Sequence, residues 1–148
     1  MSYVSLKYHL VFSTKERRRL STTDIRSRLT QYIGGIIRDL GGKMLAGNGP
    51  EDHFHVAAIL TQKLALMEVL KIVKCRSSEW IHDTFAGARD FDWQDGYSAF
   101  TVSHSVIPEV IRYVENQLEQ HRKMTFQEEL IALLKRHEID YDERYIWR

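Results

Sequence analysis

Residues 51–60 read EDHFHVAAIL and decide the fold, because two histidines open an apolar run that follows a glycine- and proline-rich turn. If this run is a β-strand, alternate side chains share one face of a sheet. His53 and His55 then lie on one face and Phe54 lies on the other. Two imidazoles side by side on a rigid strand can bind one metal ion. The alternative interpretation is that both histidines only flank a buried Phe54.

The rest of the chain alternates between strand and helix patterns. Alternating aromatic and branched residues indicate strands, whereas apolar residues at helical spacing between capping residues indicate helices. Strands are predicted over residues 3–12, 43–46, 51–60 and 97–103, and helices over residues 22–40, 64–81, 106–123 and 126–137. This βαββαβ order predicts an α+β fold, a ferredoxin-like (RRM-like) antiparallel sheet covered by helices, with extra C-terminal helices.

Composition limits the class of protein. A chain of 148 residues suits one domain with its own core, which we expect to span residues 1–148. Hydrophobic residues make up 43%, which favours a globular protein over a disordered one. The lone Cys75 cannot form an internal disulfide, and neither a signal-peptide pattern nor a bilayer-length apolar run is present. We therefore expect a cytoplasmic protein with no membrane partner.

The charge is unevenly distributed along the chain. Residues 1–89 hold 14 Lys and Arg against 8 Asp and Glu, whereas residues 90–148 hold 7 against 12. A basic first part with an acidic tail suggests a surface that binds a polyanion, although charge alone favours ordinary surface variation. The basic residues that could contact nucleic-acid phosphates are Lys15, Arg17, Arg18 and Arg19 in a loop and Lys71, Lys74 and Arg76 in the second predicted helix.

A tyrosine and a glutamine on the third predicted helix complete a candidate site. At about 100° per residue, Tyr113 and Gln117 lie on the same flank of the helix. A glutamine carbonyl oxygen can bind a metal, and a tyrosine can act as a covalent nucleophile on a phosphate that the metal polarises. Tyr97 is a competing candidate, but it opens a strand and lacks a helical polar partner. The plainer interpretation of Tyr113 is an amphipathic side chain at a helix–sheet boundary.

Several stretches together resemble one protein family. They are Tyr8-His9-Leu10-Val11-Phe12-Ser13-Thr14-Lys15, His53-Phe54-His55, Lys74-Cys75-Arg76-Ser77-Ser78, Trp93-Gln94-Asp95-Gly96-Tyr97 and Tyr113-Val114-Glu115-Asn116-Gln117. The second resembles the histidine–hydrophobic–histidine (HUH) motif and the last resembles the YxxxQ helix motif of the single-tyrosine transposases. That family comprises transposases of small bacterial insertion sequences and their REP-associated relatives. The resemblance covers nearly the whole chain in the right order.

The resemblance implies an activity that can be stated as a hypothesis. Tyr113 would attack a phosphodiester of single-stranded DNA next to a hairpin, forming a 5′-phosphotyrosine and freeing a 3′-hydroxyl that later rejoins strands. His53, His55 and Gln117 would hold Mg²⁺ or Mn²⁺, which polarises the scissile phosphate. The family also implies a homodimer, in which the tyrosine of one subunit can complete the metal site of the other.

Two other functions fit the sequence. A non-catalytic, domesticated protein would bind DNA or RNA hairpins through basic and aromatic surface residues alone, with structural histidines. A metal-dependent hydrolase would cleave through a metal-activated water and release its products without any protein–DNA adduct. The grouping of His53 and His55 with Tyr113 and Gln117 favours the transposase over both.

Overall fold

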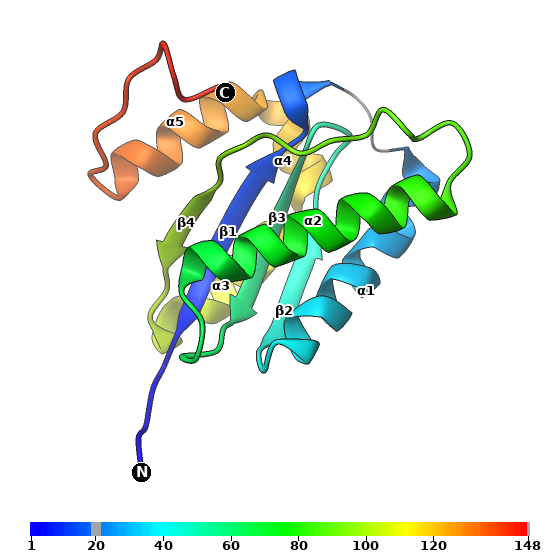
Figure 1. Ribbon diagram of the computed structural model, residues 1–148. Helices are drawn as coiled ribbons and strands as arrows, with labels where there is room; N and C mark the ends of the chain where they lie inside the picture. The colour runs from blue at the N-terminus through cyan, green and yellow to red at the C-terminus, as the bar shows by residue number, and fades with distance from the viewer. Residues whose placement is uncertain (19–21, 148) are drawn as a thin grey trace.

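The computed structural model describes residues 1–18 and 22–147. In chain order its elements are β1 (Lys7–Ser13), a 3₁₀ turn (Lys15–Arg17), α1 (Thr23–Asp39), β2 (Lys43–Asn48), β3 (His53–Ile59), α2 (Leu66–Thr84), β4 (Ser98–Thr101), a second 3₁₀ turn (His104–Val106), α3 (Ile107–Glu115), α4 (Gln117–Lys123) and α5 (Phe126–Arg136). The strands form one four-stranded sheet in the order β2-β3-β1-β4 (Figure 1). All its neighbouring strands are antiparallel, so the predicted α+β, ferredoxin-like arrangement is confirmed.

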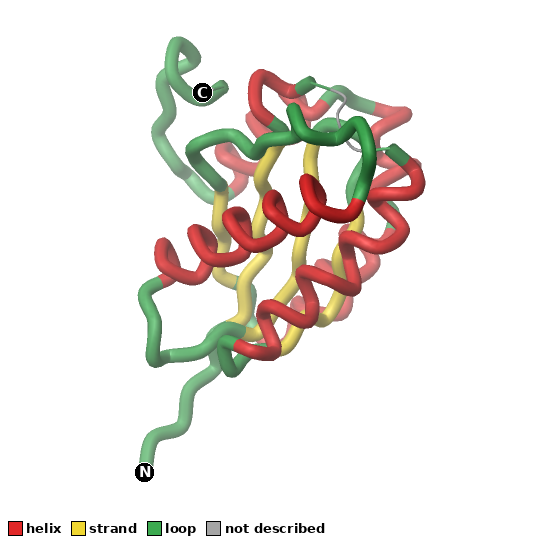
Figure 2. The backbone as a smooth tube through the Cα atoms, turned by 45° about the vertical axis from the view of Figure 1, so that its right-hand side comes forward, coloured by secondary structure: helices red, strands yellow, loops and turns green. Residues whose placement is uncertain are grey.

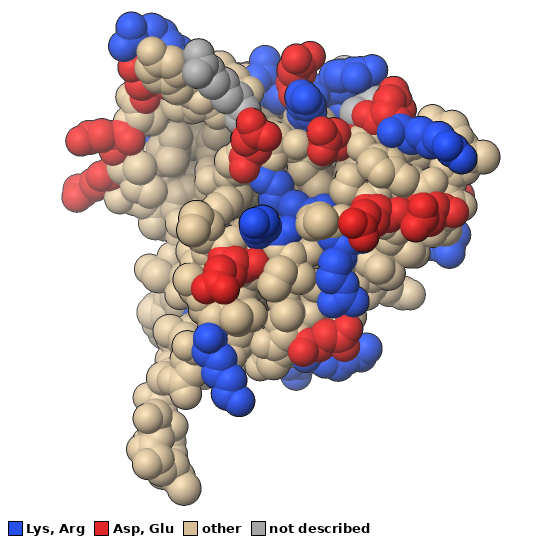
Figure 3. Space-filling view, viewed as in Figure 1, with Lys and Arg blue, Asp and Glu red and all other residues tan. Residues whose placement is uncertain are grey.

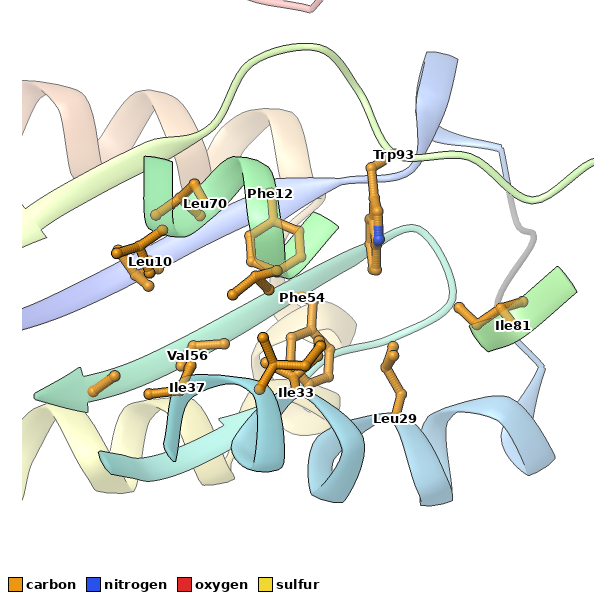
Figure 4. Close-up of a cluster of buried hydrophobic side chains, with 14 of the residues drawn as sticks. Leu10, Phe12, Leu29, Ile33, Ile37, Phe54, Val56, Leu70, Ile81 and Trp93 are labelled. Atoms are coloured by element: carbon orange, nitrogen blue, oxygen red, sulfur yellow. The ribbon is translucent and has the colours of Figure 1, made fainter. Parts of the chain in front are cut away.

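One face of the sheet packs against α1 and α2. Leu10 and Phe12 of β1 and Phe54 and Val56 of β3 point to this face, where they meet the apolar sides of both helices (Figure 4). Phe12 is fully buried and its ring lies edge-on to Trp93, with 4.8 Å between the ring centroids. The alternation along β3 thus places Phe54 in the core, as the sequence predicts.

The other face of the sheet packs against the C-terminal helices (Figure 2). Val11 and Phe100 contact the apolar side of α5, and Ala57 contacts Val114 of α3. The histidines share this face, because the register pairs His55 with Val11 and His53 with Ser13. The candidate site therefore lies between the sheet and helices α3, α4 and α5.

A close backbone approach holds the start of β3 in place. Gly49 lies in the turn before β3, and a Cβ added to it would stand 2.1 Å from the carbonyl oxygen of His53. No side chain fits in that space, so this turn needs a glycine. The glycine thereby sets the position of the first histidine.

The predicted helix over residues 106–123 is wrong in one respect, because it breaks at Asn116 into α3 and α4. Asn116 has φ −97° and ψ 20°, outside the helical region. The side chain of Asn48 donates to the carbonyl of Glu115 at 2.9 Å, and the side chain of Gln117 donates to the carbonyl of Tyr113 at 3.4 Å. Side-chain amides thus donate hydrogen bonds to two carbonyls that backbone N–H groups would bond to in a continuous helix.

β1 and β4 are shorter than predicted, whereas β2 is longer, because it continues to Asn48. β1 begins at Lys7, not at residue 3, because its neighbour β3 ends at Ile59, the partner of Lys7. β4 is limited to Ser98–Thr101, the stretch that pairs with β1. None of the helices in the described part of the chain is long and apolar enough to cross a membrane.

Candidate metal and tyrosine site

Both histidines of β3 direct the same ring nitrogen, Nε2, towards one carboxylate oxygen. Nδ1 of His53 lies 2.8 Å from Oδ1 of Asp52, and Nδ1 of His55 lies 2.8 Å from Nε2 of His9. The Nε2 atoms of both rings then face Oε1 of Glu129, at 3.3 Å for His53 and 2.9 Å for His55. Each imidazole is thus oriented through one nitrogen and offers the other, the arrangement common to metal-binding histidines.

Glu129 reaches the histidines because of its position on α5. Thr125 and Glu128 form a capping box that starts this helix. Glu129 follows in the first turn, within the stripe formed by Phe126, Leu130 and Leu133, and the packing of that stripe on the sheet carries its carboxylate inward. Glu129 is only 3% exposed. A carboxylate is rarely buried this deeply without cationic or hydrogen-bonding partners.

The predicted nucleophile and the predicted glutamine meet the same carboxylate. The hydroxyl of Tyr113 donates to Oε2 of Glu129, and Nε2 of Gln117 lies 3.3 Å from that oxygen. The rings of His55 and Tyr113 lie edge to face, with 5.8 Å between centroids. The structure therefore brings His53, His55, Tyr113 and Gln117 together around Glu129, although Tyr113 and Gln117 stand on different helices.

The electrostatics of the cluster follow from burial and close contact. Burial works against the charge of Glu129, but its contacts with His53 and His55 outweigh this and lower the pKa of the carboxyl. Burial first and then the Glu129 carboxylate raise the pKa of Tyr113 above its usual value. The cluster therefore holds an ionised carboxylate beside a neutral phenol, which donates its proton in the hydrogen bond.

The residues present fit a divalent metal ion. His53, His55 and Glu129 each offer one ligand atom, and these atoms lie within 4.8 Å of one another. Nε2 of His53 and Oε1 of Gln117 are buried and find no hydrogen-bond partner among the described residues. Buried polar atoms without a partner are costly, and a cation bound at the histidines would satisfy Nε2 of His53. Two imidazoles with hard oxygen donors suit ions such as Mn²⁺ or Mg²⁺.

His9 connects the site to the central strand and gives stability a pH dependence. Burial, and next the charge of His55, lowers the pKa of His9 from 6.5 to about 3. The unfolded chain protonates His9 below pH 6.5 while the folded chain does not, so the unfolded state binds more protons between these values. Stability is therefore full above pH 6.5 and falls as the pH is lowered towards 3. At pH 5 the expected loss from His9 is about 2 kcal/mol.

The measurement is urea denaturation of the wild type and of His9→Gln at pH 7 and pH 5. Glutamine can still hydrogen-bond to Nδ1 of His55 but does not titrate. The free energy of unfolding should fall more steeply in the wild type than in the variant, by about 2 kcal/mol over this interval. Equal losses in the two proteins would show that His9 is not the group responsible.

The predicted phosphate-binding residues fall into two separate groups. Lys15, Arg17 and Arg18 follow β1 at the end of the sheet where His53 starts β3, and the guanidinium of Arg17 stacks 5.2 Å from the centroid of the Trp147 ring. Arg19 lies outside the described residues.

Lys71, Lys74 and Arg76 lie on α2, across the sheet from the histidines. Nζ of Lys74 donates to two backbone carbonyls of the loop before β4, and Arg76 lies 3.4 Å from Asp39. Basic and acidic side chains are interspersed over this face (Figure 3). This second basic group therefore lies on the opposite side of the sheet from the site.

A cavity adjoins Tyr113 on the site face of the sheet. It has a volume of about 450 Å³ and is lined by residues of β1, β4, α3 and the end of α5, including His9, Phe100, Arg136 and His137. It gives the tyrosine access to solvent although the histidines are buried. A cavity of about 490 Å³ on the α2 face is lined by Lys71 and Lys74 and lies away from the histidines.

Sequence reasoning did not identify Glu129 or His9 as site residues. Positions 126, 129, 130, 133 and 134 form one stripe of the predicted helix. The signal for Glu129 is that it is an acidic residue within this otherwise apolar stripe. The signal for His9 is its position on β1. It lies two residues before Val11, so the two side chains share the sheet face opposite Phe12. Both signals acquire meaning only once the strands and α5 are placed together.

Comparisons with known proteins show the family and the fold that this chain shares. The family model described as "Transposase IS200 like" matches residues 2–117. A crystal structure from Deinococcus radiodurans R1, described as a candidate transposase, is similar with a TM-score of 0.63 and 24% identity over 79% of this chain and 95% of that one. A REP-associated tyrosine transposase bound to a REP hairpin is similar with a TM-score of 0.60 and 15% identity over 82% of this chain and 72% of that one. No curated protein sequence matches the chain.

Proposed function

Since the chain belongs to the IS200-like transposase family, we propose that it cleaves and rejoins single-stranded DNA beside hairpins through a 5′-phosphotyrosine on Tyr113. One observation carries the proposal. The hydroxyl of Tyr113 bonds to the carboxylate that both β3 histidines face, so a nucleophile and a metal-binding donor set share one site. Membership of the family does not by itself place the tyrosine of this chain beside its histidines.

The residues have distinct parts in the proposed reaction. His53, His55 and Gln117 would hold a divalent ion, Mg²⁺ or Mn²⁺, which would withdraw charge from the scissile phosphate when bound. Oη of Tyr113 forms a bond to phosphorus as the P–O3′ bond breaks. The phenol loses its proton and the departing 3′ oxygen takes one up. Glu129 already accepts the hydrogen bond of that phenol, so it is the nearest acceptor for the proton.

The proposed partner is DNA that combines a hairpin with unpaired bases. The structural relative bound to a REP hairpin supports a hairpin partner for this chain. The basic turn at Lys15, Arg17 and Arg18 is at the same sheet end as His53 and is the better placed of the two basic groups to contact phosphates near the scissile bond. Arg19 continues this run in the sequence, and Lys71, Lys74 and Arg76 would contact the DNA farther from it.

The proposal treats residues 1–148 as one transposase domain, because α5 lies beyond the matched residues 2–117 yet supplies Glu129 to the site. It also includes the homodimer that the family resemblance implies. Tyr113 contacts Glu129 of its own chain, so each subunit of such a dimer would have its own complete site.

The experiment that tests this function uses single-stranded oligonucleotides carrying the palindromes that flank the gene, labelled at either end. The full chain is incubated with each oligonucleotide and Mg²⁺ or Mn²⁺, and the products are separated on a denaturing gel. We expect a band of protein bound to the 5′ end of the downstream fragment, and a free 3′-hydroxyl on the other fragment.

The control is the same sequence annealed to its complement, which should give no adduct. Tight binding with no cleavage in either metal would contradict the proposal and favour the non-catalytic hairpin-binding protein. Cleavage with no protein–DNA band would instead indicate a hydrolase that uses a metal-activated water.

A further inference from the structure

We propose that Glu129 of α5 is a further protein ligand of the metal ion, beside His53, His55 and Gln117. This inference rests on the proposed function only in assuming that the histidines bind a metal. Glu129 lies 12 residues beyond the segment that matches the family, residues 2–117, so nothing in that match assigns it a role.

The hydrogen-bonding state of His53 is the first argument. The Asp52 carboxylate only accepts, so Nδ1 of His53 carries a proton and donates it. In a neutral imidazole Nε2 then presents a lone pair, and it faces a carboxylate oxygen of Glu129 at 3.3 Å. Two acceptors this close need a cation between them, either a proton on Nε2 or a metal ion bound to both.

The alignment favours the metal ion over the proton. Nε2 of His53 is buried, and its approach to Glu129 does not have the geometry of a hydrogen bond. The ligands of an octahedral ion with bonds of about 2.1 Å lie about 3 Å apart along each edge. The separations of 2.9 and 3.3 Å between Oε1 of Glu129 and the two Nε2 atoms are of this size.

The surroundings of Glu129 are those of a held ligand. Its second oxygen, Oε2, accepts from the Tyr113 hydroxyl and from Nε2 of Gln117, so the carboxylate is fixed on that side while Oε1 faces the histidines. Ligating carboxylates are commonly oriented by such contacts. One side chain would thereby connect the metal directly to the nucleophile.

The chemistry of the ion follows from this assignment. A carboxylate adds a hard, anionic oxygen to two imidazoles, which strengthens binding of Mn²⁺ and Mg²⁺. His53, His55, Gln117 and Glu129 would together hold the ion, which would act as a Lewis acid on the phosphate when bound.

The test measures Mn²⁺ binding to the full chain without DNA, by the loss of the free Mn²⁺ signal in electron paramagnetic resonance. Glu129→Gln keeps the size of the side chain but removes its charge, and it should weaken Mn²⁺ binding by about 10- to 100-fold. Glu128→Gln is the matched control: it changes the adjacent exposed residue, and glutamine preserves the capping box, so affinity should be unchanged. Glu129→Asp, which keeps the charge on a shorter side chain, should bind more tightly than Glu129→Gln.

Wild-type Mn²⁺ affinity in folded Glu129→Gln, as judged by circular dichroism, would overturn the assignment. Tighter Mn²⁺ binding by Glu129→Gln would overturn it too, and would mean that the carboxylate blocks the histidines. His55→Ala separates the two proposals. If it loses Mn²⁺ while Glu129→Gln does not, only the role of Glu129 fails, whereas if neither variant changes Mn²⁺ binding, the metal site of the proposed function fails as well.

Discussion

Tyr113→Phe is expected to abolish the covalent protein–DNA product. Phenylalanine keeps the ring that packs against His9 and His55 but removes the hydroxyl oxygen that attacks phosphorus in the proposed reaction. Without a nucleophile the rate of strand transfer should fall by about 10³-fold or more. The measurement is the initial rate of adduct formation on hairpin-flanked single-stranded DNA with saturating Mn²⁺.

The change should leave DNA binding and folding nearly intact. Phenylalanine removes one hydrogen bond to Glu129, and the site keeps its other contacts. Tyr97→Phe is the matched control, because Tyr97 is the other candidate nucleophile and packs against the core on the α2 face of the sheet. An adduct that persists in Tyr113→Phe and is lost in Tyr97→Phe would reverse the assignment.

His55→Ala is expected to remove metal-dependent cleavage. The side chain is fully buried and contacts both His9 and Glu129. Its loss removes one proposed imidazole ligand and also removes the hydrogen-bond partner of His9 and of Glu129. We expect Mn²⁺-dependent adduct formation to fall by about 10²- to 10³-fold. The rate is measured across a Mn²⁺ titration, because a lost ligand shifts the midpoint of that titration to higher concentration.

His104→Ala serves as the control for His55→Ala. His104 is exposed in a 3₁₀ turn before α3 and belongs to no cluster of metal-binding side chains among the described residues. Its variant should match the wild type at every Mn²⁺ concentration. Added imidazole should partly restore His55→Ala by entering the space left by the ring, and circular dichroism checks that the variant is folded. If His55→Ala cleaves at the wild-type rate, His55 is not a metal ligand.

Local patterns in the sequence predicted most of the fold and part of the site. Period-2 alternation placed His53 and His55 on one face of a strand with Phe54 on the other, and helical spacing placed Tyr113 near Gln117. These features depend on residues a few positions apart. The break at Asn116 was missed because it depends on Asn48, 67 residues before the carbonyl of Glu115 that its side chain binds.

The sequence by itself determined the order of the strands and helices, the face that carries the histidines, and the pairing of a tyrosine with a glutamine. Only the tertiary structure decided which other groups join them. Glu129 stands 74 residues from His55 and His9 stands 46 residues before it, and each reaches the site through the packing of α5 or the register of β1 against β3. Strand and helix periodicity are local properties of the chain. The convergence of these side chains depends instead on how whole elements bury their apolar faces, and no local pattern records it.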